Sequence, residues 1–541
     1  MNGADLFALS LRAQGVEWIG TLCGHGLNEV YAACLRADIK LVDVRNEQTA
    51  AYMAECWGRL SRQVGVCAVS SGVAHANAMA GVVNAQFDGA PMLLLTGAGP
   101  LGTAGLGHFQ DFDQLGLAAS MCKYARVLDV AERIPEFVHQ AFAAALSGRP
   151  GPVHLTFPMD VQEVEVDVEL PSGPAQAPAR MHAAPEDVER AVDLLEAAER
   201  PVLMAGSGAY YAGAEGVLAE FAAAYAIPVM VPIWDRGTVA SDMAEFMGVS
   251  GAASGGPELL PQADLVLLLG AAADYRVGYL QAPGLHPRAQ VIKVDVDLGR
   301  LGEKRPVELE IQADPAVVLE QLHAACSRCQ MGGFKDWLAA ARELGDAFQD
   351  RLIKGAVRGN GLHALDIIEA LEEVLSPAAV VVVDGGNIGQ WFHQTLGRRS
   401  YPGRYLTCGA SGVVGYGIAG ALAARVGFPK EPVVLLSGDG AATFTLTELE
   451  CAVRQQLPFV MIVADDESWG ITESGHLQRY GKAMSSTLGP VDFAAVAQGL
   501  GALGVRVSSK GELVDLLCRG LGESVPMLVH VPIAGGMPGG E

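Results

Sequence analysis

Two short acidic motifs in the last quarter of the sequence have the residue types of a magnesium and phosphate site. A Gly-Asp-Gly motif at residues 438–440 follows an apolar run rich in β-branched residues, and the pair Asp465-Asp466 follows a second apolar run. Both runs predict buried parallel strands. Taken singly, each motif is more often a turn or the end of a strand. Their spacing and their apolar flanks favour a site that holds a phosphate through a metal ion.

The segment between the motifs predicts the helix that links these strands. Thr445 and Glu448 form a capping-box pattern at its start, and it ends before Pro458. A strand, helix and strand in this order bring the carboxyl ends of both strands to one edge of a sheet. Mg²⁺ binds about six oxygens and is usually held by one or two carboxylates together with substrate phosphates. We therefore expect the two acidic motifs to share one Mg²⁺ ion.

This arrangement resembles the thiamine diphosphate enzymes of the acetohydroxyacid synthase and pyruvate decarboxylase superfamily. In that family, Gly-Asp-Gly is followed by Asn-Asn, where this sequence has Asp465-Asp466. The resemblance implies a Mg²⁺ ion held by Asp439, Asp466 and the main-chain carbonyl of Ser468. It implies further contacts to thiamine diphosphate from Gly386, Asn387, Gly412, Val414, Gly438, Asp439, Gly440, Ala441, Asp466, Ser468, Trp469 and Gly470.

Two positions depart from the family pattern. Asp466 adds a negative charge where the family has a neutral amide, so it binds the ion more strongly but repels the diphosphate. Val414 lies at the wedge position that bends the cofactor, where a larger Met, Leu or Ile is usual. These departures motivate one alternative, a regulatory protein that keeps the fold without catalysis.

A second resemblance lies near the amino terminus. Residues 45–56, RNEQTAAYMAEC, resemble the family segment that carries the catalytic glutamate. The resemblance implies that Glu47 hydrogen-bonds N1′ of the aminopyrimidine from an apolar, water-poor position. Without it, a glutamate in this position would be read as a charge that stabilises a helix N-terminus.

Several segments are similar to the benzaldehyde lyase type of this family. The similarity implies that His25 and Gln110 face the thiazolium and move protons to and from the substrate hydroxyl. Residues expected to line the substrate pocket are His108, Phe109, Trp391 and Trp469.

The expected activity is a carbon–carbon bond made or broken beside a carbonyl group. The resemblance implies a C2 carbanion and an enamine intermediate, with 2-hydroxy ketones or 2-oxo acids as substrates. Lyase and carboligase activity is the first expectation. The alternatives are acetolactate synthase-like acyl transfer, 2-oxo acid decarboxylation and 2-hydroxyacyl-CoA cleavage.

Length and composition fit three α/β domains, each with a doubly wound parallel sheet. The chain has 541 residues, half of them hydrophobic, with 66 glycines. Shifts in composition predict a pyrimidine-binding domain at 1–165, a central domain at 183–330 and a diphosphate-binding domain at 355–535. The resemblance implies a homodimer or homotetramer with active sites between subunits. The terminal stretch GGMPGGE is expected to be disordered.

The net charge and the cysteine content limit the classes of binding partner and the cellular compartment that we expect for this protein. A net charge of −24 without basic clusters argues against nucleic acid binding. No long apolar run predicts a membrane span, and scattered cysteines predict a reducing cytoplasm. The Cys326 and Cys329 pair is weak evidence for zinc or redox chemistry. The middle of the chain has no convincing nucleotide motif, although Asp274, Arg276 and Arg300 are placed where they could contact a nucleotide.

Overall fold

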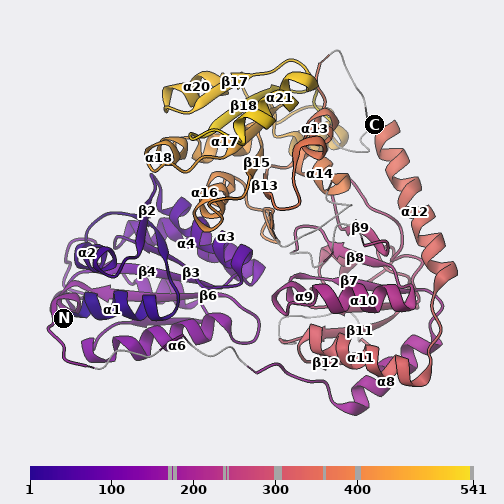
Figure 1. Ribbon diagram of the computed structural model, residues 1–541, viewed down its shortest axis with the longest axis horizontal. Coiled ribbons are helices and arrows are strands. Elements are labelled where there is room, and N and C mark those ends of the chain that lie inside the picture. Colours follow the sequence, from indigo (N-terminus) through magenta and orange to yellow (C-terminus); the bar gives the residue numbers. More distant parts are fainter. Residues whose placement is uncertain are drawn as a thin grey trace.

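The chain forms three α/β units, each built on a six-stranded parallel sheet with helices on both faces (Figure 1). This computed structural model describes residues 1–168, 173–174, 179–235, 239, 243–297, 307–356, 361–396 and 404–536. The prediction of three doubly wound parallel sheets is confirmed. Arg300 lies outside the described residues.

The N-terminal unit has the strand order β2-β1-β3-β4-β6-β5. Its strands are β1 (Trp18–Leu22), β2 (Lys40–Asp43), β3 (Gly65–Val69), β4 (Met92–Ala98), β5 (Tyr124–Val127) and β6 (Pro152–Pro158). Its helices are α1 (Gly3–Ala13), α2 (Asn28–Arg36), α3 (Glu47–Ser61), α4 (Val73–Asp88), α5 (Gln114–Ala119), α6 (Ile134–Leu146) and α7 (Met159–Glu163).

The central unit has the order β12-β11-β10-β7-β8-β9. Its strands are β7 (Pro201–Ala205), β8 (Val229–Pro232), β9 (Phe246–Ser250), β10 (Leu265–Leu269), β11 (Gln290–Asp295) and β12 (Leu309–Gln312). Its helices are α8 (Pro185–Ala197), α9 (Ser207–Tyr211), α10 (Glu215–Tyr225), α11 (Pro315–Cys329) and α12 (Lys335–Lys354), with the short 3₁₀ segment η3 (Tyr275–Leu280) after β10. Helix α12 runs along the outside of the molecule from this unit towards the third (Figure 1).

The C-terminal unit has the order β14-β13-β15-β16-β18-β17. Its strands are β13 (Val380–Asp384), β14 (Tyr405–Leu406), β15 (Val433–Gly438), β16 (Val460–Asp465), β17 (Leu503–Arg506) and β18 (Met527–Pro532). Its helices are α13 (Ala364–Val374), α14 (Asn387–Gln394), α16 (Gly417–Gly427), α17 (Asp439–Thr445), α18 (Glu448–Arg454), α19 (Gly470–Tyr480), α20 (Phe493–Gly499) and α21 (Lys510–Gly520).

The N-terminal and C-terminal units share one hydrophobic core. Helix α3 packs on α16, and buried side chains of both units form one continuous cluster. A Cβ atom at Gly427 would lie 1.9 Å from the ring of Trp57, so a glycine is required at this contact. The C-terminal end of α16 is therefore held against the N-terminal unit.

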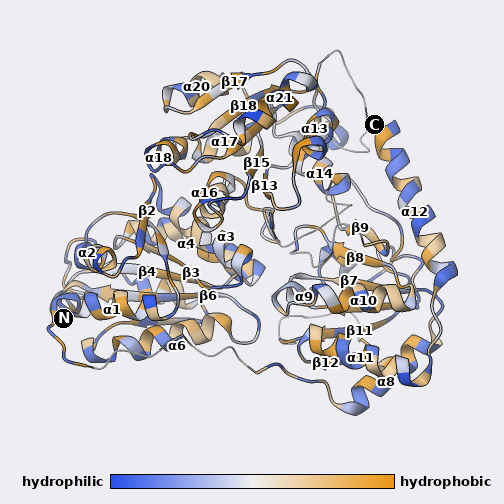
Figure 2. Ribbon diagram, in the orientation of Figure 1, coloured by the Kyte–Doolittle hydropathy of each residue, from blue (hydrophilic) through white to orange (hydrophobic). Residues whose placement is uncertain are grey.

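Hydropathy follows the layers of the fold. The strands inside each unit are largely apolar, whereas the outer faces of helices such as α12 are polar (Figure 2). This is the pattern of parallel sheets that are covered on both faces. Within the described part of the chain, no helix combines the length and apolar character that a membrane span requires.

The structure corrects two local predictions. Thr445 ends α17 and donates its hydroxyl hydrogen to the Gly415 carbonyl, whereas α18 starts at Glu448 after Thr447, whose side chain makes no cap bond. The expected capping box is therefore wrong. Of the C-terminal glycine-rich stretch, Gly535 and Gly536 are described and pack near the acidic motifs, and the rest lies outside the described residues.

Candidate active site

Three carboxylates lie at the carboxyl edge of the C-terminal sheet. Strands β15 and β16 are parallel neighbours, so Asp439 and the pair Asp465-Asp466 leave the sheet at the same edge. The Asp439 carboxylate is buried and accepts hydrogen bonds from the Gly440 amide at 2.8 Å and the Ser468 amide at 3.2 Å. The first motif thus fixes the loop that follows the second.

Asp466 completes this edge together with a residue from a third strand end. Its carboxylate accepts from the Ser468 hydroxyl at 3.1 Å and from the side-chain amide of Asn387 at 3.3 Å. Asn387 is the first residue of α14, just after β13. The amide oxygen of Asn387 is buried without a hydrogen-bond partner among the described residues, so an acceptor remains open to a cation beside two carboxylates.

Asp465 is held differently from its neighbour. His530 on β18 lies 2.7 Å from the Asp465 carboxylate through Nε2, and both side chains are buried. Burial raises the pKa of Asp465, but the hydrogen bonds from His530, from the Glu467 amide and with Asp439 together outweigh burial, so that pKa is lowered. Asp465 is therefore a structural carboxylate that ties β16 to β18.

The electrostatics of the other two carboxylates favour a bound cation. Burial, with a smaller effect of the Asp466 charge, raises the pKa of Asp439 to about 7. Burial also raises the pKa of Asp466. A divalent cation would relieve this cost of burying negative charge. In the described part of the chain no three His, Cys, Asp or Glu side chains converge on one point, so a metal here needs further oxygens, such as those of a diphosphate.

A cavity of about 270 Å³ opens next to these carboxylates. Its lining contains every cofactor-contact residue predicted in the C-terminal unit, together with Trp391. These residues are Gly386, Asn387, Gly412, Val414, Gly438, Asp439, Gly440, Ala441, Asp466, Ser468, Trp469 and Gly470.

The glycines of this cavity are required by close contacts. A Cβ atom at Gly440 would lie 2.7 Å from the Trp469 ring, and one at Gly470 would lie 2.7 Å from the Asn387 amide nitrogen. A Cβ atom at Gly386 would lie 2.9 Å from the Ile471 side chain. The loops that carry these three glycines therefore pack closely together around the cavity.

A buried aspartate holds the loop that carries Gly412 and Val414. Asp384, at the end of β13, accepts hydrogen bonds from the amides of Gly415 and Gly417. Burial raises the pKa of Asp384 to about 6, although both hydrogen bonds lower it. Gly412 has a φ of +69°, which suits glycine. This network sets the position of Val414 in the cavity wall.

Glu47 is the first residue of α3 in the N-terminal unit. Asn46 caps this helix, and the side-chain amide of Asn77 donates to the Glu47 carboxylate at 3.1 Å. Within one chain Glu47 is half-buried. The apolar, water-poor surroundings expected for this carboxylate thus need a further covering element.

His25, His108 and Phe109 form a second cluster in the N-terminal unit. The His25 ring stacks on His108 at 5.7 Å and meets Phe109 edge-on at 5.2 Å. Nε2 of His25 is buried and has no hydrogen-bond partner in the described residues. The imidazole therefore keeps one ring nitrogen open for a ligand.

Gln110 extends this cluster through the loop before α4. The Ser71 hydroxyl donates to the Gln110 amide oxygen at 2.9 Å, and Gly72 packs against Gln110. Gln110 has a φ of +58°, which is uncommon for a residue with a side chain. Two short contacts and a strained backbone fix the direction of this side chain.

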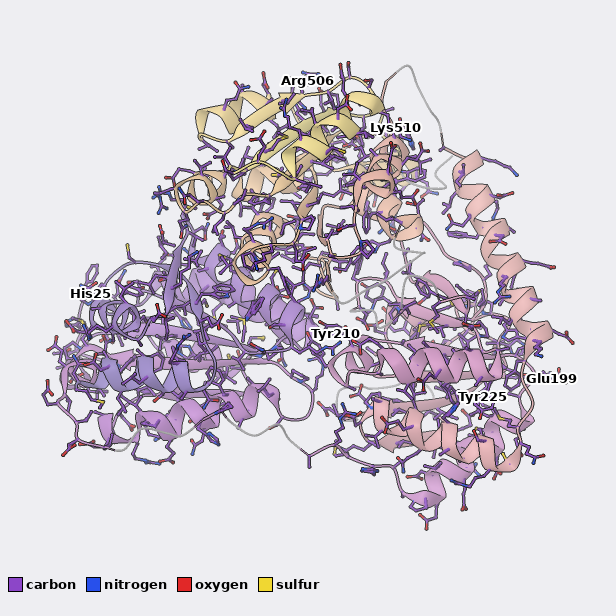
Figure 3. All side chains as sticks on the ribbon, viewed as in Figure 1. His25, Glu199, Tyr210, Tyr225, Arg506 and Lys510 are labelled. Atoms are coloured by element: carbon purple, nitrogen blue, oxygen red, sulfur yellow. The ribbon has the colours of Figure 1, made fainter. Side chains whose placement is uncertain are left out.

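One chain does not bring the two sets of predicted residues together. The cavity beside the acidic motifs is lined, within the described ranges, by Trp234 and by residues from 385 to 536. His108 and Gln110 instead line a separate cavity of about 160 Å³, formed by residues 98 to 158. His25 lies on the side of the N-terminal unit that faces away from the central unit (Figure 3).

Asp274 and Arg276 line a third cavity, of about 510 Å³, at the junction of the N-terminal and central units. The buried Arg276 guanidinium is already paired with Asp235 and Asp274. These charges therefore hold the central unit together.

Sequence reasoning missed four residues that shape these sites. Asn77, Asp384 and His530 act through partners that are far away in the sequence, and Trp234 comes from a different unit. The signal for Asp384 was present in the sequence, since Asp384 ends an apolar strand as Asp465 does.

Three family models match the chain in order. The model described as thiamine pyrophosphate enzyme, N-terminal TPP binding domain, matches residues 1–117. The central-domain model of the same enzymes matches 188–322, and the C-terminal TPP binding domain matches 384–531.

Similarity to curated proteins extends over nearly the whole chain. A probable acetolactate synthase of Mycobacterium bovis is 30% identical over 534 residues, which cover 98% of this chain and 95% of that protein. The acetolactate synthase isozyme 2 large subunit of Escherichia coli is 28% identical, covering 98% and 96%. The 2-hydroxyacyl-CoA lyase 2 of Caenorhabditis elegans is 29% identical, covering 93% and 84%.

Proposed function

Because this chain belongs to the family of thiamine pyrophosphate (thiamine diphosphate) enzymes, we propose that it cleaves and joins 2-hydroxy ketones in the manner of a benzaldehyde lyase. The family assignment gives a thiamine diphosphate-dependent carbon–carbon lyase or transferase, with Mg²⁺ as the usual metal. The proposal concerns its substrate and the residues that act on it.

The residues around the C-terminal cavity fit the cofactor and its metal. The carboxylates of Asp439, which is buried, and Asp466, which is half-buried, would bind Mg²⁺ together with the Ser468 carbonyl. The unpaired amide oxygen of Asn387, whose amide nitrogen donates to Asp466, offers a further oxygen ligand. Backbone amides of the glycine-rich turns would hold the diphosphate. When bound, thiamine diphosphate supplies a carbon nucleophile and an electron sink.

The N-terminal residues would handle protons. Glu47 would hold a proton against the pyrimidine ring, with Asn77 fixing the carboxylate. His25, through its unpaired Nε2, would give and take the proton of the substrate hydroxyl, and the Gln110 amide would hydrogen-bond that hydroxyl and orient it for the transfer. Gly412 and Val414 would set the bend of the cofactor.

The two sets of residues support a homodimer or homotetramer with shared active sites. They line separate cavities in one chain, so a site that uses both requires a second copy. Phe109 and Phe444 are 65% and 54% exposed in the single chain, which suits burial by a partner. We keep 1–165, 183–330 and 355–535 as the domain limits. The ten free cysteines suit a cytoplasmic enzyme.

The residues that line the two cavities support the proposed choice of substrate. Among the described residues that line them there is no Lys or Arg, and Trp234, Trp391 and Trp469 contribute aromatic surface. A 2-oxo acid brings a carboxylate that finds no permanent cation here, whereas a neutral 2-hydroxy ketone needs none. This favours an uncharged donor.

Acetolactate synthase-like acyl transfer is the second candidate. The names of the relatives from Mycobacterium bovis and Escherichia coli favour it, and the Caenorhabditis elegans relative favours 2-hydroxyacyl-CoA cleavage. Each of these predicts a charged donor, pyruvate or an acyl-CoA, so substrate profiling separates them from the first proposal.

The test is calorimetric titration of thiamine diphosphate into metal-stripped protein with and without Mg²⁺, followed by turnover assays with benzoin, acetoin and pyruvate. We expect Mg²⁺-dependent binding, turnover of the neutral donors, and loss of turnover in Glu47→Ala with binding retained. Turnover of pyruvate alone would replace the proposal by acyl transfer or decarboxylation. Absence of binding under any metal condition would support a regulatory protein.

A further inference from the structure

Trp234 has a backbone conformation that a bulky side chain rarely adopts. Its φ is +71°, in the left-handed region. For a residue of this size such a value is an outlier, and it persists only where the surrounding structure enforces it. Outliers of this kind concentrate at binding and catalytic sites.

A buried ion cluster enforces this conformation from both sides. Trp234 follows β8, and Arg276 donates to the carbonyl of Ile233 on one side and pairs with the carboxylate of Asp235 on the other. Asp274 accepts a second set of hydrogen bonds from the same guanidinium. The side chain of Arg276 is 3% exposed, so this clamp is rigid and shielded from water.

The C-terminal unit fixes the same turn. The hydroxyl of Thr407 donates to the Trp234 carbonyl at 3.1 Å. Thr407 opens the segment that leads to Gly412 and Val414. The turn of the central unit is thereby aligned with the loop of the predicted cofactor site.

Trp234 itself belongs to the wall of that site. Trp234 lines the cavity beside Asp439, and among the described lining residues it alone comes from outside the C-terminal unit. Its ring packs on Tyr275 at 6.4 Å with an interplanar angle of 55°. Tyr275 is held in turn beside Arg276, so the clamp positions both rings.

We propose that Trp234 determines substrate specificity by forming an aromatic wall that favours an aryl over an alkyl substituent on the carbonyl donor. This inference rests on the proposed function and names its substrate class. An aryl substituent on the donor can form edge-to-face or offset-stacked contacts with an indole, whereas an alkyl substituent in the same position cannot. A strained backbone is retained at Trp234 because it aims the indole at the donor.

The test compares Trp234→Leu and Trp234→Gly with a control, Tyr279→Leu. Tyr279 is an exposed aromatic residue of η3, the segment that also contains Tyr275, and it is not in the lining of the cavity. Glycine removes the indole and the backbone strain together, whereas leucine keeps the strain. We expect kcat/KM for benzoin relative to acetoin to fall about tenfold in both Trp234 variants. The ratio and the thiamine diphosphate affinity should stay unchanged in the control, and the melting temperature should be higher for Trp234→Gly than for Trp234→Leu.

A binding measurement keeps the inference independent of turnover. Benzaldehyde and acetaldehyde are titrated calorimetrically into cofactor-loaded Glu47→Ala protein, with and without Trp234→Leu. A preference for benzaldehyde that disappears in the double variant supports the wall even if the donors of the proposed function are wrong. Equal losses for both donors, or an unchanged preference, would overturn the inference and leave Trp234 a structural residue.

Discussion

Replacing Arg59 by methionine should destabilise the protein strongly at pH 7 and much less at pH 5. Arg59 lies fully buried in α3, with Nη1 at 3.0 Å from Glu55 and 3.4 Å from Asp88, both also buried. It donates to the Thr407 carbonyl at 2.8 Å. Asp88 accepts from the Ala410 amide at 2.8 Å, so this cluster anchors the loop that leads to Gly412.

The magnitude follows from the two carboxylates that would lose their cation. Burial raises the pKa of Glu55 and of Asp88, and the charge of Arg59 opposes that rise. Without Arg59 the folded protein must protonate a carboxyl group, and at pH 7 this costs about 4 kcal/mol for a group with an unfolded pKa near 4. That agrees with the roughly 3–5 kcal/mol lost when one partner of a buried ion pair is removed.

The sign of the pH effect follows from linkage. In the variant, these carboxyl groups have a higher pKa in the folded than in the unfolded protein. The variant is therefore most stable below the unfolded pKa, and its free energy of unfolding falls as the pH rises from the unfolded to the folded pKa. Lowering the pH from 7 to 5 should recover about 2.7 kcal/mol for each proton that the folded variant takes up.

The assay is urea unfolding of wild type and Arg59→Met at pH 7, 6 and 5, together with the affinity for thiamine diphosphate. Arg62→Met is the matched control, because Arg62 lies at the end of the same helix in a half-exposed ion pair with Glu215. We expect the control substitution to lower the free energy of unfolding by less than about 1 kcal/mol, with no dependence on pH. A loss of stability in Arg59→Met that is the same at pH 5 and pH 7 would refute the reasoning.

Three further predictions concern the two halves of the site and the core. Glu47→Ala and Asp439→Ala should each be inactive on their own. When the two variants are co-expressed, about half of the dimers contain one copy of each, and one of the two sites in such a dimer is intact, so the mixture should regain about a quarter of wild-type activity. No recovery of activity would place each site within one chain. Asp466→Asn should weaken the dependence of thiamine diphosphate affinity on Mg²⁺, measured by calorimetry, and an unchanged dependence would contradict the charge argument. Burial lowers the pKa of His154 to about 3, so the neutral imidazole contributes its full stability above pH 6.5 and less as the pH drops. Between pH 7.5 and pH 5, the free energy of unfolding measured in urea should therefore fall by about 2 kcal/mol less in His154→Gln than in wild type. An equal fall in both proteins would argue against a neutral buried imidazole.

The local sequence pattern was sufficient to predict a strand wherever that strand was long and apolar. The runs that became β15 and β16 carry β-branched residues, with Asp439 directly after the first and Asp465 at the end of the second, so both the strands and their shared edge were predictable. Strands β9 and β12 offer no such signal, because β9 is interrupted by a glycine and β12 is a short edge strand that alternates buried and exposed residues. Short strands at a sheet margin give little periodicity to detect.

The capping box failed because tertiary contacts outweighed a local motif. Thr445 has the right spacing to Glu448, but its hydroxyl is drawn to the Gly415 carbonyl in the loop that Asp384 holds. Glu448 in turn accepts the backbone amide of Arg45 from the N-terminal unit. Both residues thus serve contacts between distant segments, which no local reading of the sequence contains.

The same limit explains why residue types were easier to predict than their surroundings. Asp439, Asp466 and Asn387 each follow a strand of one sheet, and parallel pairing alone brings such positions together. The surroundings of Glu47 are not set by its own sheet, since in one chain the carboxylate is half-buried and contacts Asn77. A carboxyl group that must be desolvated to act depends on the element that covers it, so assembly of a second copy over the N-terminus of α3 would complete the surroundings of the residue expected to start catalysis.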